Sequence, residues 1–428
     1  MPLKSKRSLV LYKEGVETRS DLLTLLSEAC ELEHGVACSY LYAAFSIKKN
    51  LGEFAPEQHQ KILSWSKRIY EVARQEMLHL AQVWNILAAI GGTPYYSRPN
   101  FPQGVKYYPF NIPLKLEPFG IPALDRFILY ELPSYKDQVK YCIETFGFAS
   151  EHSYTYKTVG ELYGMIRKGV LAIDESRLFI GDPKFQALQR LTFFKDIKEV
   201  TDRSSALKAI DFIVEQGEGT VSKSEGSHYH TFRKIREELG QELKESDKRK
   251  KKFKPAQNTI TNPLVNPTEG KLPKGVTPIT DPYTNEIADI FDDLYNLMMC
   301  TLQFVFANAD DPKIREGIAR FDLRLMRILG SIGEVLTLLP AGTIGTKTAG
   351  AAFTMSRHVP FSVDPRVALT MINERMQELL ARARDLASDK RKTIEVKEAL
   401  ATLEGPSKSL DDLTQEFALT RKLVHRAM

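Results

Sequence analysis

A glutamate and a histidine three residues apart stand in the middle of a long amphipathic stretch of this sequence. They are Glu76 and His79. On a helix, residues at this spacing share one face, so both side chains can bind the same metal ion. The pair alone is weak evidence, because many helices carry a solvated glutamate and a hydrogen-bonded histidine at this spacing. It becomes informative only when other segments supply further ligands.

Glu33 is the first candidate for such a further ligand. It stands among small and apolar residues, including Ala29, Cys30 and Ala37. A carboxylate on such a face is expected to be buried, and burying an unpaired carboxylate is costly. The pattern therefore calls for a cationic partner beside Glu33.

Later segments supply the remaining candidates. Carboxylate-bridged di-metal sites take one glutamate from each of two helices and a Glu-x-x-His pair from each of two others, all pointing inward. A third predicted helix carries a suitable glutamate, and a histidine follows the fourth. The predicted ligands are Glu33, Glu76, His79, Glu161, Glu218 and His228.

The carboxylate that accompanies His228 is ambiguous. Glu225 has the three-residue spacing, but Gly226 lies between them and indicates a loop rather than a helical turn. Glu218 can reach the imidazole if a kinked helix brings the two together. Glu215 is a third candidate. We favour Glu218 and leave the three alternatives open.

The ligand types indicate the metal. Four carboxylates balance two divalent cations, and hard oxygen ligands with two imidazoles suit iron or manganese more than zinc, which prefers four nitrogen or sulfur ligands. We predict two iron ions, or an iron and manganese pair, and no organic cofactor. No catalytic residue beyond the ligands is predicted.

Neighbouring histidines and tyrosines have ordinary explanations. We expect His34 and His152 to be hydrogen-bonded neighbours of the ligands rather than ligands. Tyrosines at helical spacing are usually core residues, although a radical relay or a substrate wall is an alternative. These tyrosines are Tyr40, Tyr42, Tyr154 and Tyr156.

The composition is that of a globular protein. Of 428 residues, 43% are hydrophobic and 26% are charged. Much of the net charge of +5 comes from one basic run at residues 248–254, which is typical of a solvated linker, so we expect no nucleic-acid partner. The four cysteines form no C-x-x-C pair, and neither a secretory leader nor an apolar stretch of membrane-spanning length is found. We expect a cytoplasmic protein.

Helical periodicity recurs through most of the chain and predicts an all-α fold. The predicted bundle helices cover residues 20–48, 57–90, 141–167 and 204–216, the last resuming at His228. Residues 93–122 hold seven prolines and are expected to form a long crossover, with any β structure confined to short pieces of it. Such a crossover is also a natural lid or pocket wall.

Three regions are predicted. Residues 1–240 form the di-metal bundle, residues 241–280 form a charged and proline-bearing linker, and residues 281–428 form a C-terminal helical region that packs on the bundle. The C-terminal helices are expected over residues 287–339 and 365–387.

Five ordered phrases resemble a known family. They are residues 31–34 leading to 40–43, residues 76–80, residues 91–94 leading to 98–102, residues 158–163, and residues 213–219 leading to 227–229. These phrases, within the first 240 or so residues, resemble the ferritin-like domain family that includes the iminophenyl-pyruvate dimer synthases of bisindole pigment pathways. The resemblance implies a ferritin-like four-helix bundle and its metal site.

A redox function follows from these expectations. We expect an oxidoreductase in which the metal pair acts with dioxygen or peroxide on a small organic substrate. The resemblance suggests oxidative coupling of an imine derived from an aromatic amino acid, in secondary metabolism, and a homo-oligomer is compatible with it. The alternatives are an iron-binding ferroxidase without an organic substrate and a non-catalytic helical scaffold.

Overall fold

A computed structural model describes most of the chain. The described residues are 16–50, 52–103, 112–147, 156–192, 194–217, 226–268, 270–307, 311–342, 345–356, 361 and 364–427. The chain divides into two compact units. Unit 1 comprises Met1–Ala187 and Asp196–Ala256, and unit 2 comprises Leu188–Lys195 and Gln257–Met428.

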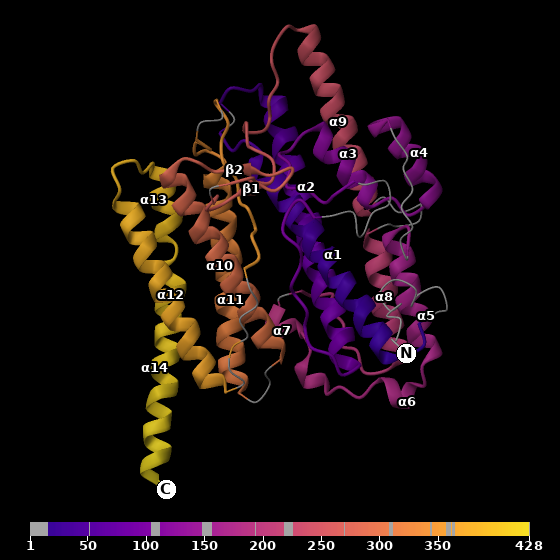
Figure 1. Cartoon of the computed structure of the whole chain (residues 1–428), viewed down its shortest axis with the longest axis vertical. Helices are drawn as coiled ribbons and strands as arrows, with labels where there is room; N and C mark the ends of the chain where they lie inside the picture. Colours follow the sequence, from indigo (N-terminus) through magenta and orange to yellow (C-terminus); the bar gives the residue numbers. More distant parts are fainter. Residues whose placement is uncertain are drawn as a thin grey trace. The chain divides into compact units, whose positions relative to one another are not determined.

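The main helix pair of unit 1 is α1 (Arg19–Ser46) and α2 (Pro56–Ala89), which pack along each other (Figure 1). Helix α1 begins with a capping box, in which Thr18 accepts from the backbone N–H of Asp21 and the Asp21 carboxylate accepts from that of Thr18. From Ala29 onward α1 is buried at almost every position. A helix buried all round lies inside a helical layer, which agrees with the expected bundle.

The other helices of the unit 1 bundle are interrupted. They are α3 (Ile121–Tyr130), α4 (Tyr135–Phe146), α5 (Val159–Ala172), α8 (Arg203–Gly217) and α9 (His228–Lys248). Helix α3 packs on α9, whereas α5 packs on α8 and α1 (Figure 1). One packed pair is thus α3 with α9, and the other is α5 with α8.

The predicted continuous helix over residues 141–167 is wrong. Gly147 adopts a left-handed conformation and ends α4. Thr158 begins α5 as its N-cap, accepting from the N–H of Glu161. These two capping signals divide the segment into separate helices, and residues 148–155 between them lie outside the described part of the chain.

The described parts of the crossover, residues 93–103 and 112–120, contain no helix. In its described parts, Gln103 and Leu114 form an isolated antiparallel bridge. Unit 1 also contains the short helices α6 (Glu175–Leu178) and η2 (Pro183–Phe185).

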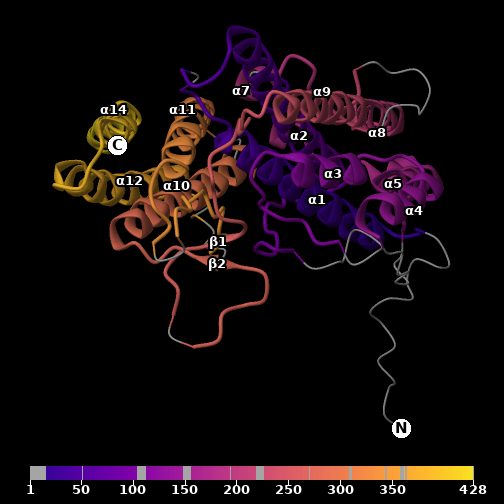
Figure 2. The same cartoon turned by 90° about the horizontal axis from the view of Figure 1, so that it is seen from above.

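Unit 2 is mostly helical. Its helices are α7 (Gln189–Thr192), α10 (Pro282–Ala307), α11 (Pro312–Leu336), α12 (Pro365–Ser388), α13 (Ile394–Ala401) and α14 (Glu404–Ala427). Helix α10 packs on α11 and α12, and α14 packs on the same two helices (Figure 2). A small parallel pair, β1 (Pro263–Leu264) and β2 (Thr277–Pro278), lies here rather than in the crossover, where we expected any strands.

The boundary between the units falls inside the expected linker. Helix α9 extends to Lys248, and unit 2 resumes at Gln257. Residues 241–280 are therefore shared between both units. The packing of the C-terminal region on the bundle stays a prediction.

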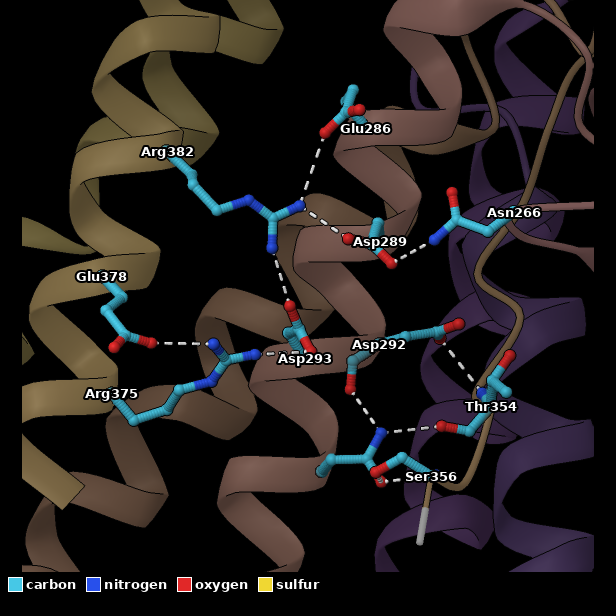
Figure 3. Close-up of polar contacts among 11 residues, drawn as sticks. Asn266, Glu286, Asp289, Asp292, Asp293, Thr354, Ser356, Arg375, Glu378 and Arg382 are labelled. Carbon is cyan, nitrogen blue, oxygen red and sulfur yellow. Dashed lines mark hydrogen bonds and ion pairs between the residues drawn. The ribbon is translucent and has the colours of Figure 1, made fainter. Parts of the chain in front are cut away.

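Two arginines of α12 bind the acidic face of α10 in unit 2 (Figure 3). Arg382 contacts Asp293 Oδ2 at 2.7 Å, Asp289 Oδ2 at 2.6 Å and Glu286 Oε2 at 3.4 Å. Arg375 contacts Asp293 Oδ1 at 2.8 Å. We call these five residues the arginine ladder. Each of its three carboxylates contacts an arginine.

No helix in the described part of the chain is long and apolar enough to span a membrane.

Candidate metal centre

Five buried side chains of unit 1 gather where the interrupted helices end and resume. Glu33 comes from α1, Glu76 and His79 come from α2, Glu131 is the C-cap residue of α3, and His228 is the first residue of α9. None is more than 7% exposed. The breaks in the bundle thus place two of these residues at helix ends.

The five side chains form two groups that share Glu76. In the first group His79 Nδ1 lies 2.9 Å from Glu76 Oε2 and 3.5 Å from Glu33 Oε2. In the second, His228 Nδ1 lies 2.8 Å from Glu76 Oε1 and 3.8 Å from Glu131 Oε2. Glu76 directs one oxygen to each group, as a bridging carboxylate does.

Two phenols hold the outer carboxylates. The hydroxyl of Tyr163 donates to Glu33 Oε1, and the hydroxyl of Tyr40 donates to Glu131 Oε1. Each outer carboxylate therefore keeps its other oxygen free to face the imidazole of its group. The arrangement repeats on the two sides of Glu76.

Within the described part of the chain, no lysine or arginine forms an ion pair with these carboxylates. Among the described residues, the ion-pair partners of Glu33, Glu76 and Glu131 are only the two histidines. Buried charges normally carry a partner of opposite sign.

Burial and proximity shift the pKa values in this cluster. Burial raises the pKa of Glu33 from 4.5 to about 7, against the opposing effect of His79, and burial and the Glu76 charge raise that of Glu131 well above 4.5. Burial alone would raise the pKa of Glu76, but His228 and His79 hold it below 4.5. Burial alone would lower the pKa of His79, yet Glu33 and Glu76 raise it to about 10.

The contact of His228 Nδ1 with Glu76 has the geometry of two ligands of one ion. His228 Nδ1 is fully buried and completes no hydrogen bond, although Glu76 Oε1 is only 2.8 Å away. Two ligands of one ion make such a contact, because both lone pairs point at the ion and not at each other. The ligand atoms of each group lie within 4.8 Å of one another, which suits a common ion. Carboxylate oxygens and imidazole nitrogens fit iron or manganese.

A cavity of ≈ 30 Å³ adjoins the cluster. It is lined by the carboxylates, His79 and Tyr163, and by apolar residues that include Val159, Ile213 and Val214. A water molecule needs roughly 10–15 Å³ on this measure, so the cavity accommodates about two species of that size.

The structure does not bring Glu161 to this cluster, which corrects our expectation for that residue. Glu161 is exposed at the start of α5, and its carboxylate accepts from the backbone N–H of Lys157 at 2.6 Å. Glu161 lies in the first turn of α5 because this helix begins just after its N-cap, Thr158, and does not continue from α4. Glu215 is exposed on α8 and belongs to neither group, whereas Glu218 and Glu225 lie outside the described residues.

Glu131 is the residue that sequence reasoning missed. It follows the apolar run Phe127-Ile128-Leu129-Tyr130 and precedes Leu132. A carboxylate in apolar surroundings was the criterion that pointed to Glu33, and the same criterion applied here would have found Glu131. His34 belongs to neither group, and its Nδ1 lies 2.8 Å from the carbonyl oxygen of Tyr96.

Comparison with protein families agrees with the fold and the expected resemblance. The ferritin-like family model matches residues 26–237. The chain therefore carries a ferritin-like domain, which contains all five clustered residues.

Two curated proteins are similar in sequence to most of this chain. The chain is 29% identical over 418 residues to dichlorochromopyrrolate synthase of Lentzea aerocolonigenes, covering 87% of this chain and 39% of that protein. It is 26% identical over 404 residues to 2-imino-3-(indol-3-yl)propanoate dimerase of Chromobacterium violaceum, covering 86% of this chain and 37% of the dimerase. The chain thus spans about two fifths of the length of these curated relatives.

A solved structure shares the fold. A ferritin-like protein from Caulobacter vibrioides superimposes with a TM-score of 0.51 at 21% identity, covering 80% of this chain and 100% of that one.

Proposed function

We propose that the clustered residues bind two iron or manganese ions, with Glu76 between them. One position consists of Glu33, Glu76 and His79, and the other consists of Glu76, Glu131 and His228. The observation that carries this proposal is the buried bridging carboxylate, with one oxygen directed to each histidine and no lysine or arginine partner among the described residues.

The protein's own residues would prepare this centre for redox chemistry. When bound, an iron or manganese pair supplies the capacity to activate dioxygen or a peroxide. Tyr163 and Tyr40 fix the outer carboxylates, and the buried surroundings exclude bulk water. The cavity beside Glu33 and His79 has room for an oxidant of about the size of dioxygen.

We infer that the substrate is a small imine derived from an aromatic amino acid. One relative is named for the dimerisation of such an imine, and both relatives are named as enzymes. Coupling two imine molecules forms one carbon–carbon bond and releases two protons and two electrons, which one peroxide accepts to leave as two water molecules. The imine is larger than the described cavity, so it would bind at the apolar wall, where Val159 and Val214 are partly exposed.

A matched pair of variants tests this function. Glu131→Gln removes a proposed ligand with little change in volume, whereas Glu161→Gln changes the exposed cap. The protein is loaded with iron, its metal content is measured, and imine consumption is followed with peroxide or dioxygen. We expect wild type and Glu161→Gln to bind about two ions per chain and turn over the imine, as a bridged di-metal site requires. Glu131→Gln should lose at least one ion and the activity.

Other outcomes would revise the proposal. Retention of both ions in Glu131→Gln would contradict the ligand assignment. Two ions that oxidise iron but leave every imine unchanged would favour the alternative of iron handling without an organic substrate.

A further inference from the structure

Both imidazoles of the metal centre face a glutamine with the nitrogen that points away from the carboxylates. His79 Nε2 lies 3.0 Å from Gln216 Oε1, and His228 Nε2 lies 2.9 Å from Gln75 Oε1. An amide oxygen can only accept a hydrogen bond, so Nε2 of each ring is the donor. A neutral imidazole then has its lone pair on Nδ1, the atom directed at the carboxylates.

We propose that Gln75 and Gln216 are positioning residues that select this tautomer and direct Nδ1 of both histidines into the centre. The inference rests on the proposed metal function and assigns its two supporting residues. The partners that orient metal-bound histidines are commonly carboxylates, backbone carbonyls or water. Neutral amides would do the same here without adding negative charge to a site that already contains three carboxylates.

The two glutamines connect different helices across the breaks in the bundle. Gln75 on α2 holds the first residue of α9, and Gln216 near the end of α8 holds His79 on α2. Each contact therefore fixes both a ring and a helix end.

Gln75 is itself oriented, which distinguishes it from Gln216. Its amide nitrogen donates to Glu71 Oε1 at 3.3 Å, and Glu71 accepts two bonds from Arg74, at 3.0 and 2.6 Å. Turning the Gln75 amide would lose the bond to Glu71 and present a donor to His228. No comparable donor contact of Gln216 is present among the described residues, so the Gln75 side is the more firmly fixed.

Cobalt(II) titration of metal-depleted protein tests the inference. The number of ions, their affinities and the cobalt absorption spectrum are measured for wild type, Gln75→Leu, Gln216→Leu, Gln75→Glu and Gln216→Glu. Each leucine variant should weaken one of the two positions by about 10–100-fold and change its spectrum, as loss of a partner of a metal-bound histidine does. The glutamate variants keep an acceptor and should keep both positions. Gln60→Leu, at an exposed position of α2, is the control.

A variant outside the buried site distinguishes loss of the Gln75 contact from misfolding. Glu71→Ala, at an exposed position, should weaken only the His228 position, and by less than Gln75→Leu does. Circular dichroism confirms that each variant is folded. Equal cobalt affinity in wild type and both leucine variants would overturn this inference and leave the metal function standing, as would equal losses in the leucine and glutamate variants. A wild-type protein that binds no cobalt, iron or manganese would overturn both.

Discussion

The acidic residues of the two units are balanced in different ways. In unit 2, Asp289 and Asp293 are more than a quarter exposed and contact arginines at 2.6–2.8 Å (Figure 3). In unit 1, Glu76 is 2% exposed and has only histidines as ion-pair partners among the described residues. Acidic side chains therefore pair with arginines between the helices of unit 2 and with histidines in the buried cluster of unit 1.

The difference is the reason that we propose a cation site in unit 1 and none in the arginine ladder. The arginine ladder is complete, and its charges are screened by water, so it stabilises the contact between α10 and α12 modestly. The cluster around Glu76 is incomplete without either protons or metal ions, since burial penalises uncompensated charge. Acidic residues alone do not indicate a metal site, and the candidate in unit 1 rests on buried carboxylates that converge with two histidines.

The largest effect is expected from the bridging carboxylate. Glu76→Gln replaces one of the two ligand oxygens by an amide nitrogen and removes the negative charge that both groups share, so both ions should be lost, from about two per chain to about none. Elemental analysis after gel filtration measures this. Arg382→Met in the arginine ladder should leave the metal content unchanged. Retention of both ions in Glu76→Gln would contradict the assignment of Glu76 as a shared ligand.

Removing the metal should destabilise unit 1. A ligand present at about 1,000 times its dissociation constant contributes about 4 kcal/mol, which corresponds to roughly 8–16 °C in the melting temperature of a unit of this size. Both tryptophans of the chain, Trp65 and Trp84, lie on α2, so their fluorescence reports on this unit. We expect the fluorescence transition to fall after chelation and to recover with iron. An unchanged midpoint would count against the metal centre.

As pH rises, the metal-free protein should lose folding stability, whereas metal binding should become stronger. The pKa is raised in the folded state for Glu33, from 4.5 to about 7, and for His79, from 6.5 to about 10. The folded state then binds more protons than the unfolded state, so stability from these groups is lost as pH rises from about 4.5 to about 10. Metal binding displaces these protons and strengthens with pH.

Urea unfolding followed by tryptophan fluorescence measures both trends. Glu33→Gln should make the metal-free dependence less steep between about pH 4.5 and 7, because it removes one of the groups that titrate there. A metal-free stability that rises over this range, equally in wild type and Glu33→Gln, would contradict the assignment.

The smallest effect is expected in the arginine ladder. Arg382→Met breaks contacts with three partly exposed carboxylates and should cost about 1 kcal/mol, less at high salt. Hydrogen exchange of α10 and α12 should accelerate about fivefold, while α2 is unchanged. Arg384→Met, which breaks an exposed pair with Glu404, is the control and should cost less than Arg382→Met does. A loss of several kcal/mol in Arg382→Met would contradict the screening of the ladder by water.

Some of this site follows from the sequence for physical reasons. Helices α1 and α2 have long uninterrupted periodicity, so Glu33, Glu76 and His79 could be placed on inward faces from the sequence alone. Glu131 could not be placed by motif, because it caps a ten-residue helix and has no histidine at ligand spacing. Glu161 was predicted to be a ligand because we interpreted the apolar periodicity as continuous, whereas α4 and α5 are separate helices.

The partners of the histidines are the part that sequence cannot supply. Gln216 and His79 are 137 residues apart, and Gln75 and His228 are 153 apart. Contacts of this kind depend on how the interrupted helices pack, and no local pattern encodes them.

The most direct test of the central claim is the location of metal ions in crystals grown with iron(II), by anomalous scattering at the iron edge. We predict two peaks on either side of the Glu76 carboxylate, one among Glu33, Glu76 and His79 and the other among Glu76, Glu131 and His228. Crystals of the loaded protein with no peak at either group, or with iron bound instead at Glu161, would contradict it.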